Sequence, residues 1–203
     1  MSSILRVKDL KAYYETSSGK VVRAVDGVSF SVLRNEIFGI AGESGCGKST
    51  LALAITRLLR PPGYIADGEI FFDNINLLKL KSEELRRIRW RRISYIPQSS
   101  MNALNPVLRI KNQIIDVIKE HEKVKNEETG RLEGYVKELL ASVGLSPQVA
   151  NMFPHELSGG MRQRAIIAMA IALRPELLIA DEPTTALDVV VQRGILQLLS
   201  EIR

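Results

Sequence analysis

The segment Gly42–Thr50, with the sequence GESGCGKST, constrains the fold of this chain more than any other stretch. It fits the pattern G-x-x-x-x-G-K-[ST], the phosphate-binding P-loop. Glycines let the backbone wrap closely around an oxyanion, so that successive N–H groups point inward. The Lys48 ammonium would then lie on the β- and γ-phosphates of a nucleotide, and the Ser49 hydroxyl would hold Mg²⁺. The residues expected at this site are Gly42, Ser44, Gly45, Cys46, Gly47, Lys48, Ser49 and Thr50.

The sequence on both sides supports this interpretation over that of a flexible glycine loop. Residues 36–41 (EIFGIA) predict a buried strand before the loop. An apolar helical stripe follows the loop and is stopped by Pro61 and Pro62. Its members are Leu51, Ile55, Leu58 and Leu59. Strand, glycine loop and helix are the context that a P-loop requires.

Length and composition indicate one α/β domain, or one core with a small inserted subdomain. The chain has 203 residues, of which 45% are hydrophobic and 25% charged, enough apolar material for a real core. No apolar run reaches the length of a membrane span, and the N-terminus lacks the apolar region of a signal peptide. The single cysteine excludes an internal disulfide framework and fits a reducing compartment. The net charge of +5 is too small to indicate nucleic-acid binding by itself.

The first third of the chain predicts a small antiparallel sheet beside the P-loop unit. Residues from Ile4 to about Leu33 alternate apolar and polar around a turn at residues 16–19, and Gly68–Asp73 is a further strand. Tyr13 and Tyr14 lie at the end of the first strand. An exposed tyrosine there could stack on an adenine, but spacing alone favours a half-buried strand aromatic.

A basic stretch, Ser82–Arg92, follows this sheet and carries five arginines around Trp90. A nucleic-acid patch is one interpretation. A solvated helix face is preferred, because runs of charge usually are solvated faces. Trp90 fits a purely exposed position poorly, so a contact with a partner is the hypothesis for it.

The middle of the chain predicts a short strand and then a helical insertion. Residues 93–97 form the strand, and Gln98 follows at its carboxyl end, where ligands bind in open α/β sheets. Gln98 is thereby placed to reach Mg²⁺ or an attacking water. Residues 107–149 then predict two amphipathic helices joined by a turn at residues 126–130. His121, on the first helix, is interpreted as a surface or core-edge residue.

Two further motifs follow the helical insertion. An apolar strand, residues 177–180, runs into Asp181 and Glu182. This is the Walker B pattern, in which the aspartate assists Mg²⁺ and the glutamate faces the γ-phosphate. The alternative is a strand that ends in an acidic turn, which is common, but the P-loop upstream favours the Walker B interpretation. Upstream, Ser158 is a good N-cap for a helix, and Gly159 and Gly160 would expose N–H groups to an anion. Because one nucleotide already has its P-loop, this second phosphate site would serve the nucleotide of another molecule.

Together these motifs resemble the ATP-binding subunit of ABC transporters over nearly the whole chain. The resemblance rests on five features: the P-loop, Gln98, Leu-Ser-Gly-Gly-x-x-Gln from residue 157, Walker B and Ala186-Leu187-Asp188. Five stretches are similar to oligopeptide and dipeptide importers and to related sugar importers: residues 24–30, 42–50, 102–106, 154–157 and 181–188. In that pattern His155 is a residue beside the signature and not a catalytic histidine.

The resemblance implies a P-loop NTPase core with a flanking antiparallel β-subdomain and an inserted helical subdomain. Residues 1–100 and 175–203 would form the core, and residues 101–174 the helical subdomain. It implies ATP and Mg²⁺ as cofactors, with Ser49, Gln98 and Asp181 near the metal. Glu182 would be the general base, with Gln98 and Lys48 also in the catalytic machinery. Tyr14, or Tyr13 if the register differs by one, would stack on adenine. Ser158, Gly159 and Gly160 would contact the γ-phosphate held by a partner subunit, and Asp188 would lie at the dimer interface.

The resemblance also implies partners. The first is a second ATP-binding subunit, which is homologous or identical. The next are membrane permease subunits, to whose cytoplasmic side the chain would bind peripherally. An extracytoplasmic solute-binding protein would be an indirect partner. A soluble ABC-type ATPase in nucleic-acid maintenance is the alternative, supported by the arginine run alone; nucleic acid is therefore not an expected partner. The chain departs from the family at one point, because a switch histidine is expected on a strand beyond Arg203. It is thus expected to be a truncated ATPase domain, and binding of nucleotide without useful turnover is a third hypothesis.

Overall fold

A computed structural model of the chain describes residues 2–98, 103–122 and 129–202. It forms two compact units, residues 1–86 and 87–202. The first contains the sheet and the P-loop, and the second contains the Walker B strand and most of the helices. We describe each unit by itself.

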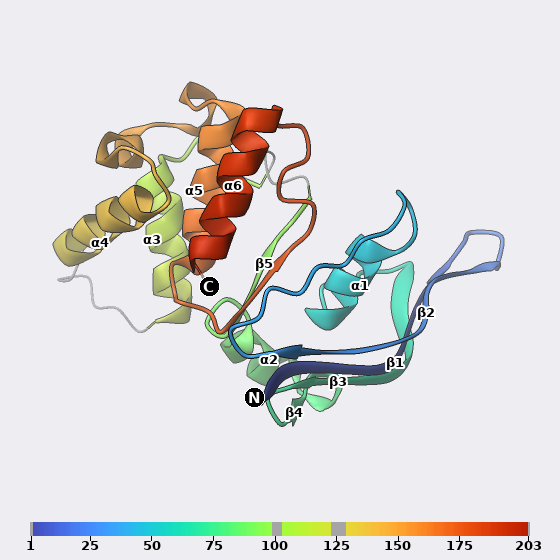
Figure 1. Cartoon of the computed structure of the whole chain (residues 1–203). Helices are drawn as coiled ribbons and strands as arrows, with labels where there is room; N and C mark the ends of the chain where they lie inside the picture. Colours follow the sequence, from blue (N-terminus) through green and yellow to red (C-terminus); the bar gives the residue numbers. More distant parts are fainter. Residues whose placement is uncertain (1, 99–102, 123–128, 203) are drawn as a thin grey trace. The chain divides into compact units, whose positions relative to one another are not determined.

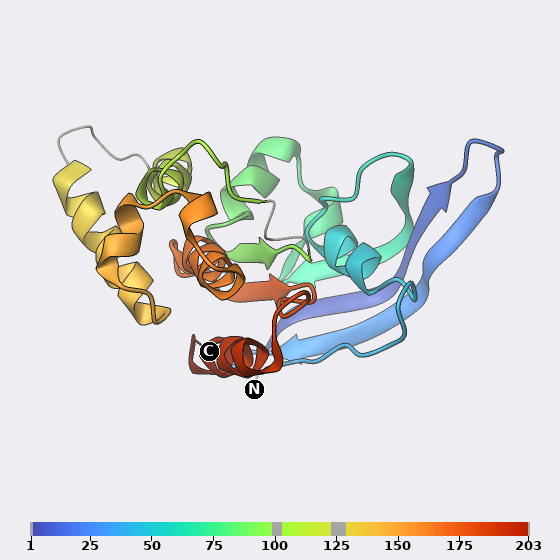
Figure 2. The same cartoon turned by 90° about the horizontal axis from the view of Figure 1, so that it is seen from above.

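The first unit is built on a four-stranded antiparallel sheet, as the sequence predicts (Figure 1). Its strands are β1 (Ser3–Glu15), β2 (Val21–Leu33), β3 (Gly63–Phe72) and β4 (Ile75–Asn76), in the order β2-β1-β3-β4. The long β1–β2 hairpin is visible in blue in Figure 2, and its turn is closed by the Thr16 N–H, which donates to the Lys20 carbonyl at 2.8 Å. Alternate residues of the strands fill the core, and Leu10, Ile70 and Phe72 are fully buried.

Helix α1 (Lys48–Ile55) follows the P-loop and packs on β1, β2 and β3. It is shorter than the apolar stripe predicts, because it ends before Leu58 and Leu59. The Thr56 hydroxyl donates to the Ala52 carbonyl at 2.9 Å, and Arg57 takes a left-handed conformation with φ of 52°. The Arg57 guanidinium then donates to the Leu77 and Leu80 carbonyls. The helix thus ends at a left-handed residue whose side chain contacts a distant segment, and apolar periodicity contains neither piece of information.

The predicted buried strand at residues 36–41 is wrong. The segment is irregular and exposed, with Ile37 58% and Ile40 48% accessible. No strand within the described residues pairs with it, and a strand is stable only with a neighbour to complete its hydrogen bonds. Phe38 instead stacks flat on Phe30 of β2, with ring centroids 5.1 Å apart. An apolar run thus correctly indicates hydrophobic contact here but not a hydrogen-bonded ladder.

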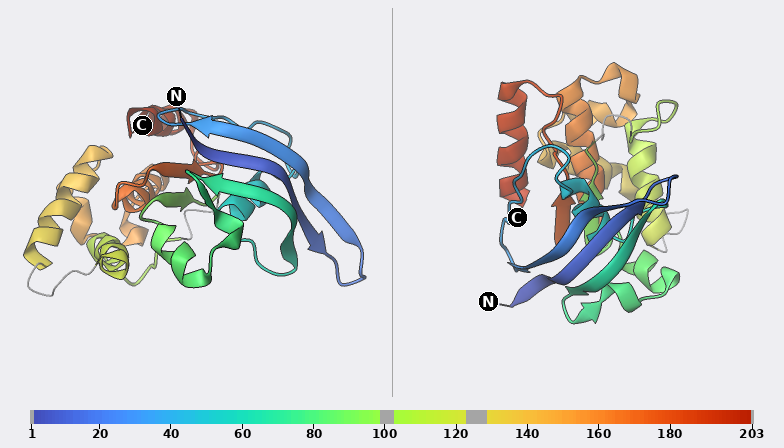
Figure 3. Two further views of the ribbon diagram at one scale, coloured as in Figure 1. Left: turned by 90° about the horizontal axis from the view of Figure 1, so that it is seen from below. Right: turned by 90° about the vertical axis from the view of Figure 1, so that its right-hand side faces the viewer.

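The second unit combines a parallel strand pair with a helical cluster. Strands β5 (Ile93–Ile96) and β6 (Leu177–Ala180) form where strands were predicted, and they pair in parallel. The helices are α3 (Ile110–His121), α4 (Thr129–Ser142), α5 (Gly159–Ile171) and α6 (Val189–Ile202), and α2 (Ser82–Ile88) lies at the junction of the two units. Figure 3 shows the four helices of the second unit in yellow-green to red. Their apolar faces share one core, in which Ile114, Leu140 and Ile195 are fully buried. Most of the predicted turn at 126–130 lies outside the described residues.

Trp90 contacts its own chain, which explains its poor fit to a purely exposed position without a partner. Its indole N–H donates to the Met169 carbonyl at 3.0 Å, and its ring stacks near His121 at 6.1 Å. His121 is accordingly the core-edge residue that the sequence predicts. Arg87 and Arg91 are exposed, as expected of a solvated face.

Candidate functional site

The P-loop backbone has the conformation that its glycines were expected to allow. Gly47 is the residue before α1 and has φ of 99°, a value that side chains with a Cβ rarely adopt. A Cβ at Gly47 would also lie 2.1 Å from the Ala24 carbonyl oxygen. Only glycine can therefore bring the loop this close to β2. The first turn of α1 directs its N–H groups toward the loop, which suits an anion.

Lys48 lies across the inside of this loop. Its ammonium donates to the Gly42 and Glu43 carbonyls, both at 2.8 Å, and lies 3.8 Å from the Cys46 sulfur. The cation of the first α1 residue is thereby held against the first two residues of the loop. A phosphate in the loop would meet this charge and the backbone N–H groups together.

Tyr14, and not Tyr13, adjoins the P-loop helix. The Tyr14 hydroxyl is 3.2 Å from the Thr50 hydroxyl, and its ring packs against Gly63, where a Cβ would be 2.7 Å from the ring. Tyr13 faces the opposite side of the sheet, because successive strand residues alternate. Its hydroxyl donates to Asp26, and this hydrogen bond, with burial second, raises the pKa of Tyr13 above its ordinary value.

Glu182 meets Gln98 where β5 and β6 end. Because the strands are parallel, their carboxyl ends share one edge. The Gln98 amide donates to Glu182 Oε2 at 2.6 Å. The Thr185 hydroxyl donates to the same oxygen at 2.9 Å. Glu182 itself has φ of 46°, a left-handed conformation that is uncommon outside glycine and often marks functional sites.

Asp181, the other Walker B carboxylate, is only 6% exposed. Its Oδ2 accepts a hydrogen bond from the Tyr95 hydroxyl at 3.1 Å. Burial, followed by the Asp181 charge and this hydrogen bond, raises the pKa of Tyr95 well above its ordinary value, so the phenol stays protonated and remains a donor. Sequence reasoning missed Tyr95 and Thr185. The available signal was a tyrosine in a short buried strand, whose hydroxyl needs a polar partner.

The signature segment begins α5 as predicted. Ser158 is the N-cap, and its hydroxyl accepts from the Met161 N–H at 3.3 Å. Gly160 has a further reason to be glycine, since a Cβ there would lie 2.7 Å from a methyl group of Val191 on α6. Asp188 caps α6, with Oδ1 accepting from the Val191 N–H at 3.0 Å. The N-cap role of Ser158 was predicted, whereas the contacts of Gly160 and Asp188 were not.

The residues present suit Mg²⁺ and a nucleotide triphosphate. The described residues hold no group of three acidic, histidine or cysteine side chains that could bind a metal by themselves. Mg²⁺ is usually held by one or two protein oxygens together with substrate phosphates. Ser49, in the first unit, and Asp181, in the second, are each an oxygen donor of this kind, and the loop around Lys48 is a candidate phosphate site.

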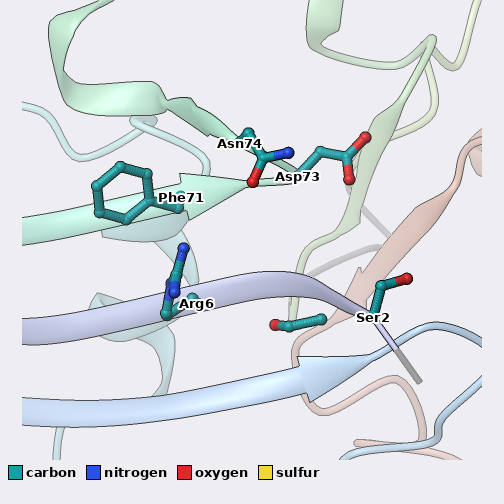
Figure 4. A pocket seen from close by; sticks show the side chains of 6 residues that line it. Ser2, Arg6, Phe71, Asp73 and Asn74 are labelled. Carbon is teal, nitrogen blue, oxygen red and sulfur yellow. The ribbon is translucent and has the colours of Figure 1, made fainter.

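A separate cavity of about 220 Å³ lies at the other end of β1 from Tyr14 (Figure 4). Arg6 and Phe71 line it, with the guanidinium 5.2 Å from the ring centroid. Asp73, also in the lining, pairs with Arg34 at 2.9 Å. This cavity contains none of the predicted site residues. Among the described helices, none is long and apolar enough to cross a membrane.

Comparison with known proteins gives one consistent result. The sequence profile of the ABC transporter family matches residues 25–185. The chain is similar to the oligopeptide transport ATP-binding protein OppD of Bacillus subtilis, at 44% identity over 100% of this chain and 56% of that protein. It is also similar to the dipeptide transport ATP-binding protein DppD of Caldanaerobacter subterraneus subsp. tengcongensis, at 42% identity over 100% of this chain and 62% of that protein. The chain therefore spans between 56% and 62% of the length of these two relatives.

Solved structures agree with the sequence comparison. A dimeric structure of MJ0796, a bacterial ABC transporter cassette, superposes with a TM-score of 0.82 at 31% identity, covering 96% of this chain and 81% of that chain. A dimeric post-hydrolysis state of the same cassette, bound to ADP and Pi, gives a TM-score of 0.80 at 32% identity with the same coverage.

Proposed function

The chain belongs to the ABC transporter family, and on that premise we propose that it is the ATP-binding and ATP-hydrolysing subunit of an importer for peptides or related small solutes. It would work as a nucleotide-sandwich dimer. The P-loop of one subunit would hold ATP, and Ser158, Gly159 and Gly160 of the other would complete the γ-phosphate site. Two dimeric structures of one similar cassette support the proposal of a dimer.

The observation that carries the proposal is the contact between Gln98 and Glu182 at the shared end of two parallel strands. A carboxylate and an amide at this edge can orient a water molecule, with Glu182 accepting its proton. Bound Mg²⁺-ATP supplies the phosphoryl group and the metal charge that stabilises negative charge on it. Lys48 would hold the β- and γ-phosphates, Ser49 and Asp181 would serve the metal, Tyr14 would contact the adenine, and Asp188 would lie at the interface.

Two substitutions separate nucleotide binding from hydrolysis. Lys48→Ala should weaken ATP binding, because it removes the cation inside the loop. Glu182→Gln should leave binding intact and lower turnover by about 10²–10⁴-fold, the usual contribution of a general base. Equilibrium binding of a fluorescent ATP analogue and a phosphate-release assay measure the two effects. Turnover like that of the unmodified protein in Glu182→Gln would contradict the role of Glu182.

The partner class rests on the relatives, two of which are named as oligopeptide and dipeptide transport proteins. We propose membrane permease subunits as direct partners at the cytoplasmic face of the membrane, with a solute-binding protein acting indirectly. Affinity purification from solubilised membranes, with mass spectrometry of the copurifying subunits, tests this. Sugar-importer permeases in their place would favour the oligosaccharide alternative. Salt-sensitive binding to DNA or RNA, with no membrane partner, would favour a soluble nucleic-acid-linked ATPase.

A further inference from the structure

The end of β5 contacts both Walker B carboxylates, with a different side chain for each. Gln98 donates to Glu182, and Tyr95 donates to Asp181. The backbone is fixed at the same place, because Ile96 pairs with Ala180 and the Asp181 N–H donates to the Ile96 carbonyl at 2.9 Å. The parallel register therefore sets the position of Asp181 before any side chain acts. What the backbone leaves undetermined is the rotation of the Asp181 carboxylate.

The Tyr95 hydroxyl restricts that rotation. It lies 3.1 Å from Asp181 Oδ2, and the aspartate is almost completely buried. A rigid ring carries this hydroxyl, and the ring is anchored on a strand paired directly with β6. Groups that hydrogen-bond to a metal-ligating carboxylate orient it and tune its affinity for the metal.

We infer that Tyr95 is a positioning residue for Mg²⁺, acting through the Asp181 carboxylate. This inference rests on the proposed function, because Asp181 is assigned to the metal there. Tyr95 would touch neither nucleotide nor metal. Its removal should weaken Mg²⁺-dependent nucleotide binding and leave metal-free nucleotide binding unchanged.

The test is Tyr95→Phe, which keeps the ring and removes the hydroxyl. A fluorescent ATP analogue is titrated in EDTA and again at rising Mg²⁺ concentration. We expect unchanged affinity in EDTA and a Mg²⁺ requirement raised by about 10–100-fold, the usual effect of losing such a partner. Tyr135→Phe is the matched control, since its hydroxyl donates to the Ala172 carbonyl at 2.7 Å in the same unit. It should leave the Mg²⁺ requirement unchanged.

A double-mutant cycle shows whether Tyr95 acts through Asp181. In an Asp181→Asn background, Tyr95→Phe should have no further effect on the Mg²⁺ requirement. An equal Mg²⁺ requirement in Tyr95→Phe and the unmodified protein, or full additivity with Asp181→Asn, would overturn the inference. Failure of the unmodified protein to bind the analogue at all would instead contradict the proposed function.

A second measurement covers the case in which Tyr95→Phe does not fold. Fluorotyrosine placed at position 95 retains both the ring and the hydroxyl. Its fluorine resonance should move when Mg²⁺ is added to the nucleotide-bound protein, and should move less when nucleotide is added in EDTA. A resonance that is insensitive to Mg²⁺ would overturn the inference.

Discussion

Gly47 combines a left-handed backbone angle with a close approach to the chain behind it. Gly45 has a similar angle, φ of 80°, but open space around its Cα, and Gly39 has neither constraint. Alanine substitutions at these three glycines therefore separate backbone strain from steric conflict. The P-loop pattern identifies Gly47 as important, but only the structure shows that the Ala24 carbonyl opposes it.

We expect a graded loss of stability along this series. Gly39→Ala should change the free energy of unfolding by less than about 0.5 kcal/mol, as at most surface sites. Gly45→Ala should cost about 1–2 kcal/mol for the left-handed angle alone. Gly47→Ala should cost more than Gly45→Ala, because the methyl group also meets a backbone carbonyl. Chemical denaturation measures the free energy of unfolding of all three variants. An equal loss for Gly45→Ala and Gly47→Ala would refute the claim that a methyl group at Gly47 is opposed by the Ala24 carbonyl.

At the scale of single residues, the candidate site is partly predictable. The sequence places Gln98 and Glu182 each just past the end of a strand, and the N-cap role of Ser158 follows from its type and place. The parallel pairing that brings Gln98 to Glu182 is shown by the structure. The donors Tyr95 and Thr185 do not follow, because each depends on where a hydroxyl points. Side-chain direction is set by tertiary packing, which spacing in the sequence does not encode.

Secondary-structure elements also divide into those that the sequence predicts and those that depend on tertiary contacts. The β1–β2 hairpin, α3 and α4 have strong periodicities and form as predicted. Residues 36–41 and the second half of the helix after the P-loop do not form as predicted. In the first case no described strand supplies hydrogen bonds, and in the second Arg57 binds carbonyls about twenty residues away. Neither the absence of a partner strand nor the Arg57 contacts can be read from local periodicity.

Helices α3 and α4 are joined by an ion pair whose effect on stability depends on pH. Lys111 donates to Glu133 at 2.9 Å, and this hydrogen bond, with the lysine charge, lowers the pKa of Glu133 below its ordinary value of 4.5. Because the folded-state pKa is the lower one, the stabilisation is present above pH 4.5 and is lost as the pH falls through the folded-state value.

Glu133→Gln should therefore lower the free energy of unfolding near neutral pH. The difference from the unmodified protein should shrink as the pH falls below 4.5. Glu138→Gln, at an exposed position of the same helix, is the control, because it removes a carboxylate and leaves the Lys111–Glu133 ion pair in place. Urea unfolding across the acidic range measures both. The ion pair has no measurable role if the two variants behave alike.

The packing of α5 on α6 gives Gly160 a role apart from any ligand. Gly160→Ala should destabilise the second unit by about 1–3 kcal/mol, because the new methyl group would overlap the Val191 side chain. Val191→Ala removes the overlapping methyl group, so the double variant should be more stable than the sum of the single effects predicts. Thermal and chemical unfolding of the four proteins test this, and strict additivity would contradict it.

At the scale of the whole molecule, nucleotide binding needs one chain, whereas the proposed function needs two. A P-loop with its lysine, held in one unit, can bind nucleotide within one chain. The signature segment at Ser158–Gly160 has no assigned ligand within its own chain under the sandwich proposal. The central claim is therefore that ATP brings a second subunit to this segment.

The most direct test is sedimentation velocity of the Glu182→Gln protein, in which hydrolysis should be blocked, with and without saturating Mg²⁺-ATP. We predict a monomer without nucleotide and a dimer with it. We also predict that Ser158→Arg in the same background still binds ATP but stays monomeric, because a large cation would fill the signature site. A protein that binds ATP yet remains monomeric without Ser158→Arg, or a dimer that Ser158→Arg leaves unchanged, would contradict the account.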